Sequence, residues 1–432
     1  MGCNRPKSGG LADKQNSKYD GFFEKFKVFG LVFRVLITIA VSLVFLPWQG
    51  AWSVETAEAE GVASNTAVST SVFRVQSEML QEALRWHRAL AGEGGWAPVP
   101  GGPTIRPDAE DPRLATLAMR LAQSGDLPDR DGTVSTSKYD DTLQEGVRRF
   151  QARHGLEVDA LVGRRTLRAL NVSIERRIDQ LRVNLERMRR LADIESNDFV
   201  LVNIAAFKAY VVRDREIVWT TKVIVGEKDD ETPEFHSALS HVVFNPTWTV
   251  PYSIASEELL PKIKSDPGFF AKGGYELFDR DGDRVDPSAV EWSSIGIGNF
   301  PFTIVQRPGP ANQLGEVKFM FPNEYSVCMH DTPARSLFDK AARAFSHGCI
   351  RVDEPRGFAE VLLARDGWTR EQVDAAIETG KTRTIGLPEP LPMYVSYWTA
   401  EVDDFGHVHF YDDLYERDAA ILGKLNATLP GN

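Results

Sequence analysis

The chain has 432 residues, which is enough for two or three domains and for a core that needs no disulfide bonds. Its 50 Lys and Arg residues against 61 Asp and Glu residues give a formal net charge of -11, which argues against a nucleic-acid partner. Three cysteines are too few for a disulfide framework or for a structural zinc site of the common four-ligand kind. We therefore expect a multidomain protein with no metal and no cofactor.

An apolar run near the N-terminus predicts export. Residues 35–46, VLITIAVSLVFL, have the length of a signal-peptide core. Residues 28–46 would form a signal anchor if Arg34 reached the membrane surface, because they approach the roughly 20 residues that a bilayer span needs. We expect residues 1–53 to be either a cleaved signal peptide or a signal anchor in the inner membrane.

Helical patterns follow a polar linker. Residues 54–71 are small, polar and without period, which predicts a flexible linker. Residues 73–91 and 110–124 have the apolar spacing of helices, and Gly125 stands where a helix C-cap is expected. We assign residues 72–135 to a helical scaffold.

A small helical unit is expected at residues 136–171. One helical face, a turn at HGLEVD and a second short helix at VGRRTLRALN follow one another closely. The first face consists of Tyr139, Leu143, Val147 and Phe150. The stretch resembles the peptidoglycan-binding-type domain over nearly its full length, which implies that glycan is a partner. The alternative is a helical spacer that packs but binds nothing.

The pattern changes from helix to strand near Phe199. Residues 172–197 contain a long amphipathic helix, which we expect to connect the small unit to the next domain. Residues 199–226 are β-branched and alternating, with a polar turn at RDRE, so a β domain begins there. Residues 248–300 interrupt this domain with a segment rich in Gly, Asp and Pro, which is typical of a lid beside a catalytic region.

Two other stretches contain potential metal ligands. Asp279, Asp281 and Asp283 alternate as in a calcium-binding loop, but the next residue is arginine where such a loop needs glycine. We expect an Asp-rich turn there. His407 and His409 alternate in HVHF as strand residues do, so we expect no metal at them either.

The stretch FSHGCIRV, residues 345–352, decides how the function of the chain is interpreted. It places Cys349 two residues after His347 and two before Arg351. A cysteine beside a histidine fits a metal-ligand pair, half of a disulfide bond, or an activated thiolate. Gly348 lets the backbone approach a substrate and frees N–H groups for an oxyanion, and the charge of Arg351 favours the thiolate.

A second histidine stands 19 residues before the cysteine. The stretch FMFPNEYSVCMHD alternates as one strand would, which puts Ser326, Cys328 and His330 on one face. A thiol nucleophile needs a base that is distant in sequence and adjacent in space, and His330 on a neighbouring strand would supply it. The alternative is a packed thiol and a solvated imidazole without a catalytic role.

The segment MHDTPARSLFDKAARAFSHGCIRV is similar to the signature of the L,D-transpeptidases with a YkuD-type catalytic domain. The resemblance covers roughly residues 75–415 and includes VVFNPTWTVPYSI, GPANQLGEVKFMFPN and YWTAEVDDFGHVHFYDD. It implies that Cys349 is the nucleophile and His330 the base. It also implies that backbone N–H groups around Gly348 and Cys349 hold the oxyanion. Ser346 and Arg351 would hold the loop, and His347 would be a neighbour that supports it.

The same resemblance implies the reaction. Cys349 would attack the bond between the third residue of a peptidoglycan tetrapeptide stem and its terminal D-Ala, forming a thioester. An amine of a second stem would then produce a 3-3 cross-link in the periplasm. We expect Trp248 and Tyr252 of the lid, and Tyr325, to contact substrate, and carbapenem β-lactams to inhibit. The alternatives are a carboxypeptidase, a transpeptidase that attaches a protein, and a wall-binding protein without activity.

Two features of the site stay open in the sequence. Family members often have His-Gly at the first histidine, whereas this chain has His330-Asp331, so the group that orients the imidazole is undetermined. A backbone carbonyl could fill this role. Cys328 stands two residues before His330 and could form an inactivating disulfide bond with Cys349 in an oxidising compartment.

The expected fold class is multidomain α+β. A mainly β catalytic domain with an inserted lid would occupy residues 198–385, preceded by the helical scaffold and the small helical domain. A β-hairpin and tail would occupy residues 386–432.

Overall fold

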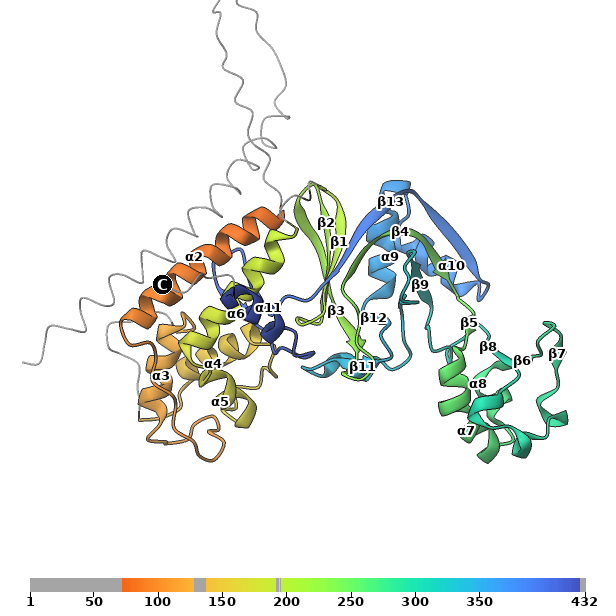
Figure 1. Cartoon of the computed structure of the whole chain (residues 1–432), viewed down its shortest axis with the longest axis horizontal. Helices are drawn as coiled ribbons and strands as arrows, with labels where there is room; N and C mark the ends of the chain where they lie inside the picture. Colours follow the sequence, from red (N-terminus) through yellow and green to blue (C-terminus); the bar gives the residue numbers. More distant parts are fainter. Residues whose placement is uncertain (1–71, 128–136, 192–193, 195, 428–432) are drawn as a thin grey trace, which may run out of the picture. The chain divides into compact units, whose positions relative to one another are not determined.

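The computed structural model of the chain describes residues 72–127, 137–191, 194 and 196–427. These residues form two compact units (Figure 1). Of the described residues, the first unit contains those between 72 and 194, residues 399–411 and residues 418–427, and the second contains residues 196–398 and 412–417. The expected signal segment at 1–53 and the linker at 54–71 lie outside the described residues. Of the helices that the structure describes, none has the length and apolarity to cross a bilayer.

The first unit is mainly helical. Its helices are α2 (Val72–Gly92), α3 (Leu114–Gln123), α4 (Asp141–Arg153), α5 (Arg164–Leu170), α6 (Ile174–Arg189) and α11 (Asp418–Ala427). A short hairpin of β14 (Ala400–Val402) and β15 (Val408–Phe410) packs beside α2, α4 and α6. The C-terminal part of the chain therefore returns to the N-terminal helices.

Local sequence signals explain these helices. The Asp140 side chain caps α4 by accepting a hydrogen bond from the Leu143 N–H, and the Ser173 side chain caps α6 in the same way. Gly125 follows α3 with a φ of 76°, as expected of a residue after a helix end. The predicted apolar face of α4 is fully buried in the core of the unit. The helical periodicities of the sequence are thereby confirmed.

The second unit is built on one large sheet. Its strands are β1 (Phe199–Asn203), β2 (Lys208–Arg213), β3 (Glu216–Gly226), β4 (Phe235–Phe244), β9 (Val317–Met320), β10 (Met329–His330), β11 (Ala344–Ser346), β12 (Ile350–Val352) and β13 (Arg383–Ser396). They follow the order β11-β3-β12-β10-β9-β4-β13-β1-β2, and β2 also pairs with β3. This extra pairing closes eight strands into a ring, with β11 attached to β3. The predicted α+β class, with a mainly β second domain, is confirmed.

Turns and helices complete the large sheet. The β2–β3 hairpin turns at Asp214 and Arg215, both with positive φ, at the polar turn that the sequence predicts. Helices α9 (Pro355–Leu363) and α10 (Arg370–Glu378) follow β12. The Phe358 ring of α9 packs against Trp219 of β3 and Phe319 of β9. Strand β13 runs through the boundary that we expected between residues 385 and 386.

The segment between β4 and β9 has its own apolar core. It contains the stretch 248–300 that we expected to be a lid, and its last strand ends at residue 306. We therefore call residues 248–306 the lid segment. Its strands are β5 (Trp248–Thr249), β6 (Tyr275–Phe278), β7 (Arg284–Val285) and β8 (Thr303–Gln306). Its helices are the π-helical turn η1 (Ile254–Leu259), α7 (Leu260–Ser265) and α8 (Phe269–Gly273), followed by the 3-10 turns η2 (Pro287–Ala289), η3 (Trp292–Ser294) and η4 (Ile297–Asn299). Apolar side chains from η1, α7 and α8 meet in one cluster. Figure 1 shows the lid segment projecting from the end of the sheet at β5 and β8.

The expected single strand at residues 319–331 is wrong. The stretch forms two antiparallel strands, β9 and β10, in which Met329 pairs with Phe319. Asn323 holds the intervening turn, because its side chain accepts hydrogen bonds from the Tyr325 and Val327 N–H groups. Ser326 has a φ of 57°, which a strand does not allow. Proline and asparagine at the turn outweigh the alternating pattern.

Candidate active site

Cys349 lies immediately before β12, after a tight turn that leaves β11. Gly348 in this turn has a φ of 93°, a conformation that residues with a side chain rarely adopt. The cysteine is half-buried, and the Ser346 hydroxyl donates to the Cys349 carbonyl at 2.5 Å. Among the described residues, the N–H groups of Gly348 and Cys349 have no hydrogen-bond partner. The turn thus fixes Cys349 and presents two adjacent N–H donors.

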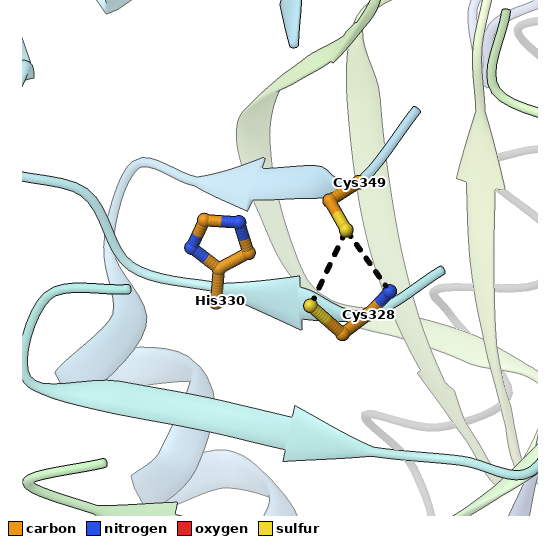
Figure 2. A group of neighbouring side chains, drawn as sticks. All are labelled: Cys328, His330 and Cys349. Atoms are coloured by element: carbon orange, nitrogen blue, oxygen red, sulfur yellow. Dashed lines mark hydrogen bonds between the residues drawn. The ribbon is translucent and has the colours of Figure 1, made fainter. Parts of the chain in front are cut away.

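His330 is brought to Cys349 by strand pairing. Strands β10 and β12 are parallel neighbours, with Met329 opposite Ile350 and His330 opposite Arg351. A ring nitrogen of His330 and the Cys349 Sγ lie within 4.8 Å of each other. Figure 2 shows the imidazole on β10 and the thiol immediately before the start of the neighbouring strand β12. The structure therefore brings together the two residues that the sequence singled out.

A backbone carbonyl orients the imidazole. The His330 Nδ1 atom lies 2.5 Å from the carbonyl oxygen of Asp331. Because a carbonyl can only accept, Nδ1 carries the proton, and Nε2 of the neutral ring is left as the acceptor. The orienting group that the sequence left open is thus the main chain.

The Asp331 side chain, unlike the backbone carbonyl that orients His330, stabilises the neighbouring backbone. Its oxygens accept from the Glu316 N–H at 2.8 Å and the Thr332 N–H at 2.6 Å, and bind Arg335 at 2.9 Å. A side chain at Gly315 would collide with this carboxylate, since a Cβ atom there would lie 2.2 Å from Oδ2. Asp331 therefore holds the segment before β9 beside β10.

Cys328 contacts the candidate nucleophile directly. Its Sγ lies 3.4 Å from the Cys349 Sγ, and its backbone N–H donates to the same sulfur at 3.4 Å (Figure 2). The hydrogen bond with Cys349, together with burial, raises the pKa of Cys328 well above that of a free thiol. Cys328 is thus the protonated partner and donates its S–H.

The same contacts favour the thiolate of Cys349. The hydrogen bond from Cys328 is the largest influence and lowers the pKa of Cys349, burial opposes it, and the His330 imidazole lowers it further, to about 4. A thiol with such a pKa is ionised at neutral pH. The arrangement can therefore supply a nucleophilic thiolate next to a proton acceptor.

Arg351 follows Cys349 on the same face of β12. Burial lowers the pKa of its guanidinium, whereas the charge of Cys349 raises it. Arg351 therefore interacts electrostatically with the candidate nucleophile, as its place in the motif suggested.

Two residues that the sequence analysis missed support the turn. The buried Thr232 hydroxyl donates to the Gly348 carbonyl at 2.8 Å and accepts from the Gly226 N–H at 2.8 Å. The Tyr415 hydroxyl donates to the Gly226 carbonyl at 2.6 Å and accepts from the Thr232 N–H. This network ties β3, the segment before β4 and the chain near residue 415 to the turn before Cys349.

His347 points to the lid segment. Its Nε2 atom lies 3.0 Å from a carboxylate oxygen of Glu258 in η1 and 4.0 Å from one of Asp230. Because Glu258 belongs to the lid segment, His347 links the lid to the turn that carries Cys349.

The three expected substrate contacts occupy different environments. Trp248 is half-buried and packs against the core of the lid segment. Tyr252 is 55% exposed, and its hydroxyl donates to the Ile297 carbonyl. Tyr325 is 47% exposed at the β9–β10 turn, with its ring centroid 5.5 Å from that of Phe235. Two of the three thus present accessible rings.

Potential metal ligands meet in two places among the described residues. Cys328, His330 and Cys349 offer two sulfurs and a nitrogen, a set that suits zinc only when both thiols are deprotonated. Exposed Glu227, Asp230 and His347 form the other group.

The two stretches that resemble metal sites in the sequence, at residues 279–283 and 407–409, form hydrogen bonds and ion pairs within the chain. His407 and His409 both contact the Asp403 carboxylate, at 3.3 and 3.1 Å. The Asp279 carboxylate accepts from the Asp281 and Asp283 N–H groups, which makes an Asp-rich turn.

Comparisons with known proteins show which families two parts of the chain match. Residues 197–373 match the family model described as "L,D-transpeptidase catalytic domain" (YkuD), and residues 110–170 match the model described as "Putative peptidoglycan binding domain". A Haemophilus influenzae protein named "Putative L,D-transpeptidase" is 35% identical over 248 residues, which are 57% of this chain and 50% of the relative. The chain thus spans about half the length of this curated relative.

Solved structures include two L,D-transpeptidases. The one from Mycobacterium smegmatis is 15% identical with a TM-score of 0.22, over 46% of this chain and 58% of that chain. The one from Xylanimonas cellulosilytica is 12% identical with a TM-score of 0.21, over 69% and 99% of the two chains. These scores are too low to add to the fold described above, and the domain matches carry the identification. The chain contains a YkuD-type L,D-transpeptidase catalytic domain together with a domain of the peptidoglycan-binding family.

Proposed function

We propose that the chain is an L,D-transpeptidase that forms 3-3 cross-links in peptidoglycan through a thioester on Cys349. The observation that supports this most is the pairing of β10 with β12, which brings the His330 imidazole beside a thiol of lowered pKa. The catalytic-domain match supplies the reaction class.

Acylation needs Cys349 as the thiolate described above, with its proton held on His330 Nε2. The Asp331 carbonyl keeps the ring oriented by accepting from Nδ1. The thiolate attacks the carbonyl of the third stem residue, and the N–H groups of Gly348 and Cys349 receive the oxyanion. His330 then returns the proton to the departing amine of D-Ala, and a thioester remains on Cys349.

Transfer to the acceptor reverses these proton movements. The side-chain amine at the third residue of a second stem attacks the thioester, and His330 accepts its proton. The Cys349 thiolate leaves, and a peptide bond joins the two third residues. Cys328 stabilises this leaving thiolate by donating its S–H.

The lid segment is expected to cover the donor stem. Tyr252 and Tyr325 present exposed rings, and Trp248 forms part of the lid that carries Tyr252. A lid that contacts His347 through Glu258 would exclude water from the thioester and so favour an amine acceptor over hydrolysis.

The proposed place of action is the periplasm. The apolar run at residues 28–46 supports export and, if uncleaved, attachment to the inner membrane. Peptidoglycan would be met there by both the catalytic domain and the peptidoglycan-binding-family domain.

Mass analysis of reaction products tests the proposal. The chain is incubated with purified tetrapeptide-bearing muropeptides, and the products are weighed. Cross-linked dimers with loss of D-Ala support the proposed function. Tripeptide alone would indicate a carboxypeptidase, and transfer to a protein lysine would indicate a protein-attaching enzyme. Unchanged substrate would contradict all three and leave a wall-binding role.

A further inference from the structure

The first unit contains a partly open cavity of about 30 Å³. Three guanidinium groups line it, from Arg120 of α3, Arg153 of α4 and Arg177 of α6. Its polar wall also contains two buried imidazoles, His87 and His154, together with Ser124 and His407. Such a concentration of buried cations is rare, because each charge loses its hydration unless a partner replaces it.

Only part of this positive charge is matched by described carboxylates. Arg153 binds Asp126 through two hydrogen bonds of 2.8 and 2.5 Å. Arg120 lies instead over the Trp96 ring, 3.9 Å from its centroid, and donates Nε to the Leu170 carbonyl at 2.9 Å. Its Nη1 atom is buried and has no hydrogen-bond partner among the described residues, although the side chain is only 2% exposed. A buried N–H donor of this kind calls for an acceptor.

The lowered pKa values of His87 and His154 indicate a positive electrostatic potential in the cavity. Each donates Nδ1–H to a carbonyl of its own helix, His87 to Ala83 and His154 to Phe150, both at 2.7 Å. Burial lowers the pKa of His87 to about 3 and that of His154 in the same direction, and Arg120, Arg153 and Arg177 all add to both shifts. Both rings are therefore neutral at pH 7, in a cavity that repels further positive charge.

The volume of the cavity and the residues that line it limit which anions could bind there. A water needs about 10–15 Å³ of such volume, so the cavity holds about two small oxygen atoms. Two oxygens in one plane are what a carboxylate offers to guanidinium groups, whereas a tetrahedral phosphate is larger. The Phe410 ring, with Arg177 4.4 Å from its centroid, and the half-buried Trp86 provide an apolar wall for an adjoining carbon group.

We propose that this cavity binds a carboxylate that is attached to a small apolar group, with the unpartnered Nη1 of Arg120 as its main donor. Stem peptides end in such a group, a D-alanine carboxylate. The assignment of the ligand to a stem peptide rests on the proposed function, whereas the carboxylate site itself does not.

Titration calorimetry tests the site with defined probes. The full-length chain carrying Cys349→Ala is titrated with N-acetyl-D-alanine, with its neutral amide and with acetate. Cys349→Ala removes turnover, so the result does not depend on the cross-linking reaction. We expect the acid to bind and the amide not to bind. Arg120→Gln should weaken binding of the acid by about tenfold or more, because the main charged donor is lost.

Arg113 provides the matched control. It is also buried in the first unit, with one Nη1 that lacks a partner among the described residues, but it binds Asp111 and does not line the cavity. Arg113→Gln should leave the affinity for the acid unchanged. Weaker binding of acetate than of the acid would identify a peptide carboxylate, and equal binding a free carboxylate. Equal binding of acid and amide would overturn the proposal even if Arg120→Gln failed to fold.

Discussion

The Cys328 Sγ lies 3.4 Å from the Cys349 Sγ, so two thiols of opposite protonation preference share one hydrogen bond at the proposed nucleophile. This bond is the largest cause that lowers the pKa of Cys349. The protonation states of Cys328 and Cys349 are therefore linked through this bond.

Replacement of Cys328 should therefore shift the ionisation of Cys349. In Cys328→Ala the S–H donor is lost, the pKa of Cys349 rises from about 4, and the thiolate fraction falls on the acidic side of the new value. The pH dependence of iodoacetamide alkylation at Cys349 measures this shift, and its rising limb should move to higher pH. Cys328→Ser, which keeps a donor, should move it less. An unchanged limb in Cys328→Ala would show that the S–H does not stabilise the thiolate.

The same pair should close into a disulfide bond when a peroxide is present. The Cys349 thiolate would take one oxygen from the peroxide to become a sulfenic acid. Cys328 would then attack its sulfur, form the S–S bond and release water. The two residues stand opposite each other at the end of the β10–β12 pairing, where strands lie about 4.8 Å apart, within the span of a disulfide bond.

Intact mass spectrometry measures that reaction. The oxidised chain should lose two hydrogens, and dithiothreitol should restore both the mass and the activity. In Cys328→Ser no thiol is available to form a disulfide bond with the sulfenic acid. Cys349 should then be oxidised irreversibly to sulfinic or sulfonic acid, a gain of two or three oxygens. Irreversible oxygenation of the unmutated chain at the same rate would contradict the prediction.

The two histidines should differ in their effect on acylation. His330→Ala removes the proton acceptor and should slow acylation by roughly 10² to 10⁴, the usual contribution of general base catalysis. His347→Ala breaks the contact with Glu258 and should act mainly on substrate affinity. Single-turnover rates and substrate affinity, measured with a muropeptide donor, separate the two effects. Equal losses of rate, or a larger loss for His347→Ala, would reverse the assignment.

The hydroxyl of Thr232 should be required for the shape of the nucleophile turn. Thr232→Val keeps the side-chain shape but leaves the Gly348 carbonyl and the Gly226 N–H without this partner. Loss of such buried hydrogen bonds costs about 1–3 kcal/mol. We expect a lower free energy of unfolding and slower acylation, with Thr232→Ser restoring both. Chemical denaturation measures the free energy of unfolding, and single-turnover kinetics measure acylation. Full activity in Thr232→Val would show that the Thr232 hydroxyl is not needed to shape the turn before Cys349.

Much of the site could be predicted because its chemistry is concentrated in local motifs. The spacing from His330 to Cys349 indicated two neighbouring strands, and the structure pairs β10 with β12. Thr232 and Tyr415 carried no such signal. Thr232 lies 116 residues from Gly348 and 183 from Tyr415, and their contacts arise only when distant segments pack together. The single strand predicted at residues 319–331 was wrong for a different reason. We gave the alternating apolar pattern more weight than the proline and asparagine that form the turn at Asn323.

Reaction with a carbapenem tests the central claim, that Cys349 is the acylated nucleophile, most directly. The strained β-lactam carbonyl is attacked as the stem carbonyl would be, and the ring opens to a thioester that stays on the sulfur. Intact mass spectrometry should show one added drug mass, which peptide mapping places on the fragment containing Cys349. The adduct should be absent in Cys349→Ala and present in Cys328→Ala. An adduct on Cys328, or one that persists in Cys349→Ala, would contradict the account.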